Sequence, residues 1–176
     1  RTRGPGRGLA ARETLTQGPI PVMHFRHWLA SLRLSLPAPE EILPHRDPFL
    51  LVDEVVELKP GQSARARWTV PEDAPFFEGH FPGYPVTPGV LIIESLAQTG
   101  GLAVLSAPEN TGTLALFAGI EKARFKRQVM PGETLDLEMT LTRQRGPIGE
   151  GTGTARVGDD IAVQAPLRFA VIEGEQ

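Results

Sequence analysis

His80 is the first residue in this sequence that could do acid–base chemistry. It lies in the segment FFEGHFPGYPVTPG, residues 76–89, where prolines restrict the backbone and phenylalanines flank the histidine. A single histidine in such a loop is more often an ordinary loop residue than a catalytic one. A rigid, apolar setting nevertheless suits an imidazole that acts as a general base near neutral pH. We therefore predict that His80 is a general base.

Glu94 is the second candidate, because it is the only charged residue in the apolar segment GVLIIESLAQTGGLAVL, residues 89–105. Burying an unpaired carboxylate is costly, so such a group takes up a proton or finds a partner. Gln98 follows four residues later and shares one face of a helix with it. The pair indicates a site lined by the helix. Two alternatives stay open: Glu94 faces solvent at the exposed end of the helix, or it caps a neighbouring loop.

Gly89 is the third candidate, at the start of the same segment and directly after Pro88. Backbone N–H groups in the first turn of a helix have no intrahelical acceptor. Such a group can donate to the carbonyl oxygen of a thioester, where negative charge develops when the adjacent carbon loses its proton. Removal of a proton next to a thioester carbonyl needs such a donor.

The elements that must position these residues begin with the segment 89–105. It predicts a buried helix, because it is apolar on nearly every side. Gly100 and Gly101 within it each cost about 1 kcal/mol relative to alanine, so we expect a neighbouring backbone to approach closely there. Before this helix, residues 71–88 hold five prolines and predict an irregular loop.

Strand patterns stand on both sides of the helix. The run LLVDEVVEL from Leu50 is apolar and β-branched, and Ala64, Ala66, Trp68 and Val70 alternate with polar residues. Further strands are expected at residues 113–118, 124–129, 134–143, 151–157 and 161–171. Several strands after one buried helix predict an α+β domain whose antiparallel sheet wraps that helix.

Composition bounds the remaining possibilities. A chain of 176 residues, 40% of them hydrophobic, predicts one domain with a sizeable core. The absence of cysteine excludes disulfides and thiolate metal sites, and it fits a reducing compartment, so we expect a cytoplasmic protein. A net charge of −3 gives no indication of nucleic-acid binding. No run approaches the roughly 20 apolar residues of a membrane helix.

The N-terminal region differs in composition from the rest. Residues 1–22 are basic, rich in glycine and proline, and precede the first methionine, Met23. They lack the apolar core of a secretory signal, and an acidic residue and prolines weaken a transit-peptide interpretation. Residues 24–36 could form a short amphipathic helix. We expect residues 1–39 to be an extension, partly disordered or foreign to the native protein, and residues 40–176 to be the folded domain.

Five short motifs follow one another along the chain. They are LPHRDPFLLVD (Leu43–Asp53), GHFPGYPVTPG (Gly79–Gly89), ESLAQ (Glu94–Gln98), FKRQVMPG (Phe125–Gly132) and RQRGPIG (Arg143–Gly149). From about Glu40 to the C-terminus the chain resembles the FabZ-type 3-hydroxyacyl-[acyl carrier protein] dehydratases of type II fatty acid synthesis. One departure is Asp47, where members of that family commonly carry tyrosine, and it bears on substrate access.

The resemblance implies the hotdog fold, an antiparallel sheet around a long central buried helix, with no metal or cofactor. It also implies a homodimer with the site at the subunit interface, often assembled as a trimer of dimers. His80 of one subunit would take the α proton of a (3R)-3-hydroxyacyl-[acyl carrier protein]. Glu94 of the other subunit would assist loss of the hydroxyl, giving the trans-2-enoyl product. Gly89, Gln98 and Phe81 would bind the substrate.

Four basic residues lie within six positions, Lys122, Arg124, Lys126 and Arg127. A solvated strand face would explain them as well as a function would. The functional interpretation is a docking patch for the acidic acyl carrier protein. His45, in the first motif, is interpreted as a structural hydrogen-bonding residue.

Other functions remain open. A FabA-type enzyme is a bifunctional dehydratase and isomerase, but such enzymes typically carry aspartate where this chain has Glu94. A hotdog thioesterase would not need GHFPG followed by a glutamate. A non-catalytic acyl-binding hotdog protein would need no acid–base pair, and a DNA-binding version would need a recognition domain. Residues 1–39 show no helix-turn-helix pattern, and the presence of both His80 and Glu94 favours the enzyme.

Overall fold

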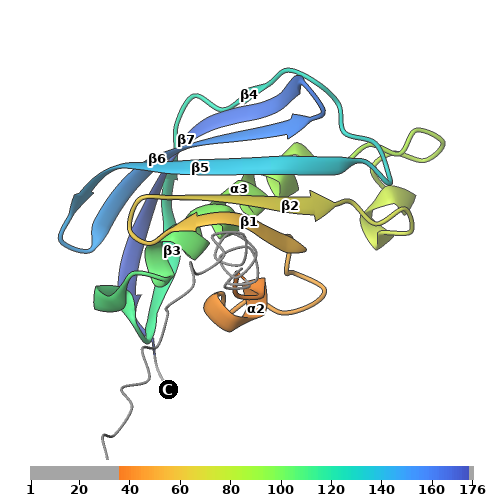
Figure 1. The fold of residues 1–176 in the computed structure, drawn as a ribbon. Coiled ribbons are helices and arrows are strands. Elements are labelled where there is room, and N and C mark those ends of the chain that lie inside the picture. The colour runs from red at the N-terminus through yellow and green to blue at the C-terminus, as the bar shows by residue number, and fades with distance from the viewer. Residues whose placement is uncertain (1–35, 175–176) are drawn as a thin grey trace, which may run out of the picture. The chain divides into compact units, whose positions relative to one another are not determined.

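One long helix and one antiparallel sheet make up most of the part that this computed structural model describes, residues 36–174 (Figure 1). The helix is α3 (Gly89–Leu105). The strands are β1 (Glu54–Lys59), β2 (Ser63–Thr69), β3 (Thr113–Ile120), β4 (Arg124–Phe125), β5 (Thr134–Arg145), β6 (Ile148–Val157) and β7 (Asp160–Glu173). The short helical turns are α2 (Pro39–Ile42), η1 (Pro75–Glu78) and η2 (Pro108–Asn110).

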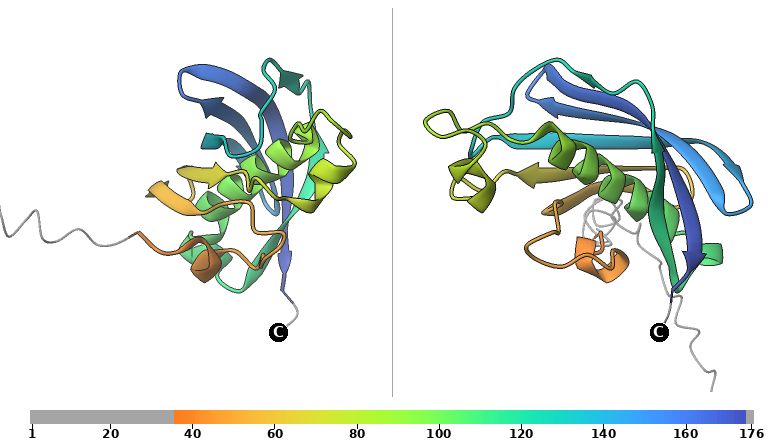
Figure 2. Two further views of the ribbon diagram at one scale, coloured as in Figure 1. Left: turned by 90° about the vertical axis from the view of Figure 1, so that its right-hand side faces the viewer. Right: turned by 180° about the vertical axis from the view of Figure 1, so that it is seen from behind.

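The sheet curves around α3. Its strands run in the order β1-β2-β5-β6-β7-β3, and the short β4 pairs with β7. Helix α3 contacts β2, β5, β6 and β7, and Figure 2 shows it running along the concave side of the sheet. This confirms the predicted α+β class and the hotdog fold.

Alternation along the strands decides which side chains enter the core. In β2, Ala64, Ala66 and Trp68 are buried, while Arg65 and Arg67 between them are exposed. The buried positions of β5 alternate in the same way, and its register with β2 places them on the same face. One face of the sheet therefore supplies the apolar residues that pack on α3, as the sequence pattern predicted.

The bounds of α3 agree with the predicted helix, and core side chains approach its glycine pair closely. A Cβ atom on Gly100 would lie 3.1 Å from Met139 Cγ, and one on Gly101 would lie 3.0 Å from Leu43 Cδ2. The approaching groups are thus side chains of β5 and of the segment after α2. The expectation that a neighbouring backbone approaches here is wrong. These glycines make room for core side chains.

Two predicted strands are shorter in the structure because their backbone groups bond to other segments, whereas the strands expected at 113–118, 134–143, 151–157 and 161–171 are longer than predicted, as β3, β5, β6 and β7. The strand expected from Leu50 begins only at Glu54, since the N–H of Leu51 donates to a side chain of α3 instead of a strand. The strand expected at 124–129 ends at Phe125. Beyond it the chain turns to support the loop before α3, where Val129 O accepts a hydrogen bond from the N–H of Thr87. The loop at 71–88 contains the short helical turn η1.

The expectations for the N-terminus fall largely outside the described residues. The extension up to residue 35, with most of the helix expected at 24–36, is not among them. Within residues 36–174, no helix is both long and apolar enough to cross a membrane.

Candidate active site

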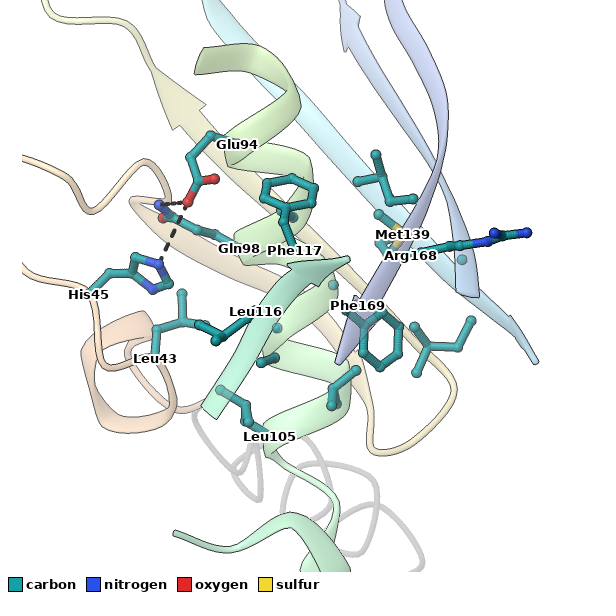
Figure 3. Close-up of a pocket in the computed structure, with 18 of the residues that line it drawn as sticks. Leu43, His45, Glu94, Gln98, Leu105, Leu116, Phe117, Met139, Arg168 and Phe169 are labelled. Atoms are coloured by element: carbon teal, nitrogen blue, oxygen red, sulfur yellow. Dashed lines mark hydrogen bonds and ion pairs between the residues drawn. The ribbon is translucent and has the colours of Figure 1, made fainter. Parts of the chain in front are cut away.

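Glu94 lies on the second turn of α3 and meets two nitrogen donors. Its carboxylate oxygen Oε1 accepts a hydrogen bond from Gln98 Nε2 at 3.0 Å, and His45 Nε2 lies 3.6 Å from the same oxygen. Figure 3 shows both side chains directed at that oxygen. Only 17% of the Glu94 side chain is exposed, so the carboxylate does not simply face solvent. The expectation that a carboxylate on this apolar helix finds a partner is confirmed.

Gln98 anchors the site to the segment that precedes β1. Its side chain is buried, and its Oε1 accepts the N–H of Leu51 at 2.8 Å. Its Nε2 donates to Phe49 O at 2.9 Å as well as to Glu94. One amide therefore fixes the first motif against α3 and holds the carboxylate in place, which gives this polar pair a structural reason on an otherwise apolar helix.

His45 is the residue of this cluster that the sequence reasoning assigned to structure alone. It precedes Glu94 by 49 positions, so no local pattern connects the two residues. The structure brings its imidazole to the carboxylate, while its Nδ1 atom is buried without a hydrogen-bond partner among the described residues. Only the fold places His45 at the site.

A cavity of about 200 Å³ opens beside Glu94. His45, Glu94 and Gln98 line one side of it, and apolar side chains such as Met139 and Phe169 line the other (Figure 3). A carboxyl group at the edge of an apolar cavity suits a ligand with a polar reactive end and a hydrocarbon chain. Nothing in the sequence distinguishes the residues of β5 and β7 that line this cavity, because their alternation is that of ordinary core positions.

His80 is held by the loop that contains it. Its Nδ1 atom lies 2.8 Å from Val86 O, and because a carbonyl oxygen only accepts, Nδ1 carries the proton. The other nitrogen, Nε2, is left with a free lone pair. The ring stacks on that of Phe81, with centroids 4.3 Å apart. Reciprocal backbone bonds between Phe81 and Tyr84, at 3.0 and 2.8 Å, close the turn. The local structure thus leaves Nε2 available to accept a proton.

Gly89 is the first residue of α3, and its N–H has no acceptor within residues 36–174. The aromatic ring of Phe125 covers it, since a Cβ atom at this position would lie 2.5 Å from Phe125 Cε1. Phe125 itself is 55% exposed. The position therefore requires glycine for packing as well as offering a backbone donor. Phe125 is a neighbour of this donor that the sequence reasoning did not identify.

The candidate residues fall into two groups within one chain. Glu94 and Gln98 line the cavity together with His45. His80, Phe81 and Gly89 are not among its lining residues. A single described chain thus presents Glu94 at the cavity, and His80 on a loop outside that cavity.

The four basic residues at positions 122–127 also fall into two groups, one residue paired with a carboxylate and three exposed. Arg127 donates two hydrogen bonds to Glu133, at 2.8 and 2.6 Å. This pairing lowers the pKa of Glu133 below its ordinary value, despite the opposing effect of burial. Lys122, Arg124 and Lys126 are exposed and form none of the ion pairs found within residues 36–174. Three of the four predicted docking residues are therefore free surface cations, and Arg127 is committed to a structural pair.

Sequence relatives of this chain are close. A FabA-like domain model matches residues 43–166. A 3-hydroxyacyl-[acyl-carrier-protein] dehydratase FabZ from Staphylococcus carnosus is 56% identical over 132 residues, which cover 75% of this chain and 91% of that protein. The protein of the same name from Macrococcus caseolyticus is 52% identical over 140 residues, covering 80% of this chain and 97% of that protein.

Solved structures share the fold at much lower identity. The dehydratase heterocomplex ApeI:P from Xenorhabdus doucetiae matches with a TM-score of 0.66 at 21% identity, over 78% of this chain and 93% of that chain. An uncharacterized protein from Pyrococcus horikoshii gives a TM-score of 0.59 at 14% identity, over 80% and 98% of the two chains. These likenesses show the fold, and the sequence relatives show the family. The chain belongs to the FabA-like family, among the FabZ 3-hydroxyacyl-[acyl-carrier-protein] dehydratases.

Proposed function

We propose that this chain converts (3R)-3-hydroxyacyl-[acyl carrier protein] to the trans-2-enoyl thioester and water in fatty acid biosynthesis. The observation that carries the proposal is the placement of Glu94 at the edge of an apolar cavity in a chain of the FabZ family. The cavity suits the acyl chain, and Glu94 then stands where the polar end of the substrate would lie. Absence of cysteine fits a cytoplasmic enzyme of this kind.

The proposed chemistry uses the atoms of His80, Glu94 and Gly89 that form no hydrogen bond needed by the fold. Nε2 of His80 takes the proton from Cα, and the electrons of that C–H bond form the new Cα–Cβ double bond. The Cβ–O bond breaks, and the departing hydroxyl takes a proton from Glu94 to leave as water. The N–H of Gly89 stabilises the charge that develops on the thioester oxygen. Transfer of the proton from His80 back to Glu94 restores both groups.

The proposed site needs residues of two subunits. Strand β3 supports such pairing because it is an exposed, apolar edge strand. Its side chains Leu116, Phe117 and Ile120 are 50%, 43% and 51% exposed. An exposed apolar edge strand is a template for pairing with another chain. Leu116 and Phe117 also line the cavity, so a second copy paired along β3 would cover the cavity and bring its own His80. The family resemblance supports a further assembly of three such dimers.

The proposed reaction is tested with the purified protein and a trans-2-enoyl or 3-hydroxyacyl thioester. We expect interconversion of the two, visible by mass spectrometry as gain or loss of one water molecule and as a change in absorbance of the conjugated thioester. Release of free thiol would indicate a thioesterase instead. Movement of the double bond to the 3-position would indicate the bifunctional alternative, and binding without turnover would indicate a non-catalytic acyl-binding protein.

Subunit complementation is expected if the base and the acid come from different chains. His80→Ala and Glu94→Gln proteins should each be inactive, and mixing them should restore partial activity, because some heterodimers hold one intact site. Subunit exchange is verified by mass spectrometry of differently tagged chains. Each protein mixed with itself serves as the control. A mixture that exchanges subunits but stays inactive would place the whole site within one chain.

The exposed cations of the basic segment are expected to act on the carrier protein. Replacing Lys122 and Lys126 together by glutamate should raise KM for a carrier-linked substrate and change little for a short thioester without the carrier. Surface charges at the edge of an interface act mainly on encounter rate, so the difference should shrink as salt rises. Arg145→Glu, an exposed reversal in the β5–β6 hairpin, is the control. Equal losses on both substrates would assign the lysines to the fold.

A further inference from the structure

The imidazole of His45 and the amide of Gln98 meet the same oxygen of Glu94. His45 Nε2 lies 3.6 Å from Oε1, and Gln98 Nε2 donates to Oε1 at 3.0 Å (Figure 3). Within the described residues, no donor is found on the second oxygen, Oε2. The two oxygens of this carboxyl group are therefore unequal: one is held by the protein, and the other is free.

The surroundings of His45 fix which of its nitrogens carries the proton. Its Nδ1 is buried and has no hydrogen-bond partner among residues 36–174. A buried N–H without an acceptor is rarer and more costly than a buried acceptor without a donor. The neutral ring therefore carries its proton on Nε2, the nitrogen that faces Glu94. His45 and Gln98 both direct N–H groups at Oε1.

The segment that carries His45 is itself held in place. Arg46 Nη1 donates to the carbonyl oxygens of Leu43 and His45, at 2.8 and 2.6 Å. Gln98 then holds the same segment through Phe49 O at 2.9 Å. The backbone on both sides of His45 is thus held by hydrogen bonds, and only 29% of the His45 side chain is exposed. The backbone that carries the ring is therefore tied to α3.

We propose that His45 is a positioning residue, which with Gln98 fixes Oε1 of Glu94 so that Oε2 is the oxygen that delivers the proton to the leaving hydroxyl. The proposal rests on the proposed dehydration and deepens it. The hydrogen bond from Gln98 and the facing imidazole of His45 both lie at Oε1, which leaves Oε2 as the place for the acidic proton. The 3.6 Å separation is long for a hydrogen bond, and such contacts often tighten only when substrate is bound.

A matched pair of amides tests the proposal. His45→Gln places an amide nitrogen where Nε2 stands, whereas His45→Asn is one methylene shorter and does not reach Oε1. We expect His45→Asn to lower kcat about tenfold, the order of one lost hydrogen bond, with KM changed less than about twofold. His45→Gln should keep most of kcat. Glu40→Gln, an exposed change on α2, is the control for the surrounding segment.

A double variant separates positioning from structural support. In the Glu94→Gln background, adding His45→Asn should cause no further loss of residual activity, because His45 acts through the group already removed. Equal losses in both backgrounds, or loss in His45→Gln as large as in His45→Asn, would overturn the proposal. Full activity of His45→Asn would overturn it as well. If wild-type protein fails to dehydrate the substrate, the proposed function has failed instead, so the two failures are distinguishable. Thermal unfolding of each variant confirms that the fold is kept.

Discussion

Replacing His80 by alanine is expected to lower kcat by roughly 10²–10⁴-fold or more, while the fold stays intact. The reason is the state of the imidazole: Nδ1 is bound to Val86 O at 2.8 Å, so Nε2 is the nitrogen with a free lone pair. Removing the ring removes the imidazole base that the loop presents. The measurement is kcat on a 3-hydroxyacyl thioester, with circular dichroism and thermal unfolding to verify the fold.

His80→Asn is the matched control for this experiment. The asparagine amide can keep a hydrogen bond to Val86 O in place of Nδ1, but it has no atom that replaces Nε2. If the ring serves only to hold the turn between Phe81 and Tyr84, His80→Asn should recover activity. We expect it to be as inactive as His80→Ala. Near-normal activity in either folded variant would remove His80 from the mechanism.

Glu94→Gln is expected to lower kcat by on the order of 10²-fold or more, because an amide keeps the shape of the carboxyl group but gives up no proton. Its amide oxygen can still accept the hydrogen bond from Gln98, which is 3.0 Å long in the wild-type protein. The loss therefore reports on proton transfer and not on the packing of α3. KM should change less than kcat, since the group acts mainly in the transition state.

Glu94→Asp completes the series. It keeps an acidic proton but shortens the reach by one methylene, which withdraws the carboxyl group from Gln98 and His45 and from the substrate. A misplacement of about 1 Å can cost ~10²-fold, so we expect a measurable remainder above that of Glu94→Gln. Wild-type kcat in Glu94→Gln would make Glu94 a polar structural residue, and the acid would have to come from another group.

The local elements of this protein were predictable because their signals are local. Segment 89–105 is apolar on nearly every side and lies between a proline-rich loop and a polar turn, and it forms α3 with the predicted bounds. The alternation around Trp68 likewise predicted β2 and its buried face. The motifs containing His80 and Glu94 were sufficient to indicate the family, because residue types at a fixed spacing can be recognised without any knowledge of the fold.

The end of one strand was decided by the tertiary structure. The pattern after Phe125 continues as a strand in sequence, yet the chain leaves the sheet there, since the carbonyl of Val129 is needed by the loop before α3. The periodicity of a sequence indicates which side chains suit a strand. It carries no information about which backbone groups will form hydrogen bonds with a distant loop.

The sequence by itself determined the helix, its single carboxylate and the histidine loop, because these depend on composition and spacing along the chain. Only the tertiary structure decided what surrounds them. His45 and Glu94 are 49 residues apart and meet because Gln98 binds the backbone at Phe49 and Leu51. Met139 and Phe169 read as ordinary core residues, and the curvature of the sheet around α3 brings them to the same cavity. Contacts between distant segments follow from how the sheet folds over the helix, and no single stretch of sequence encodes them.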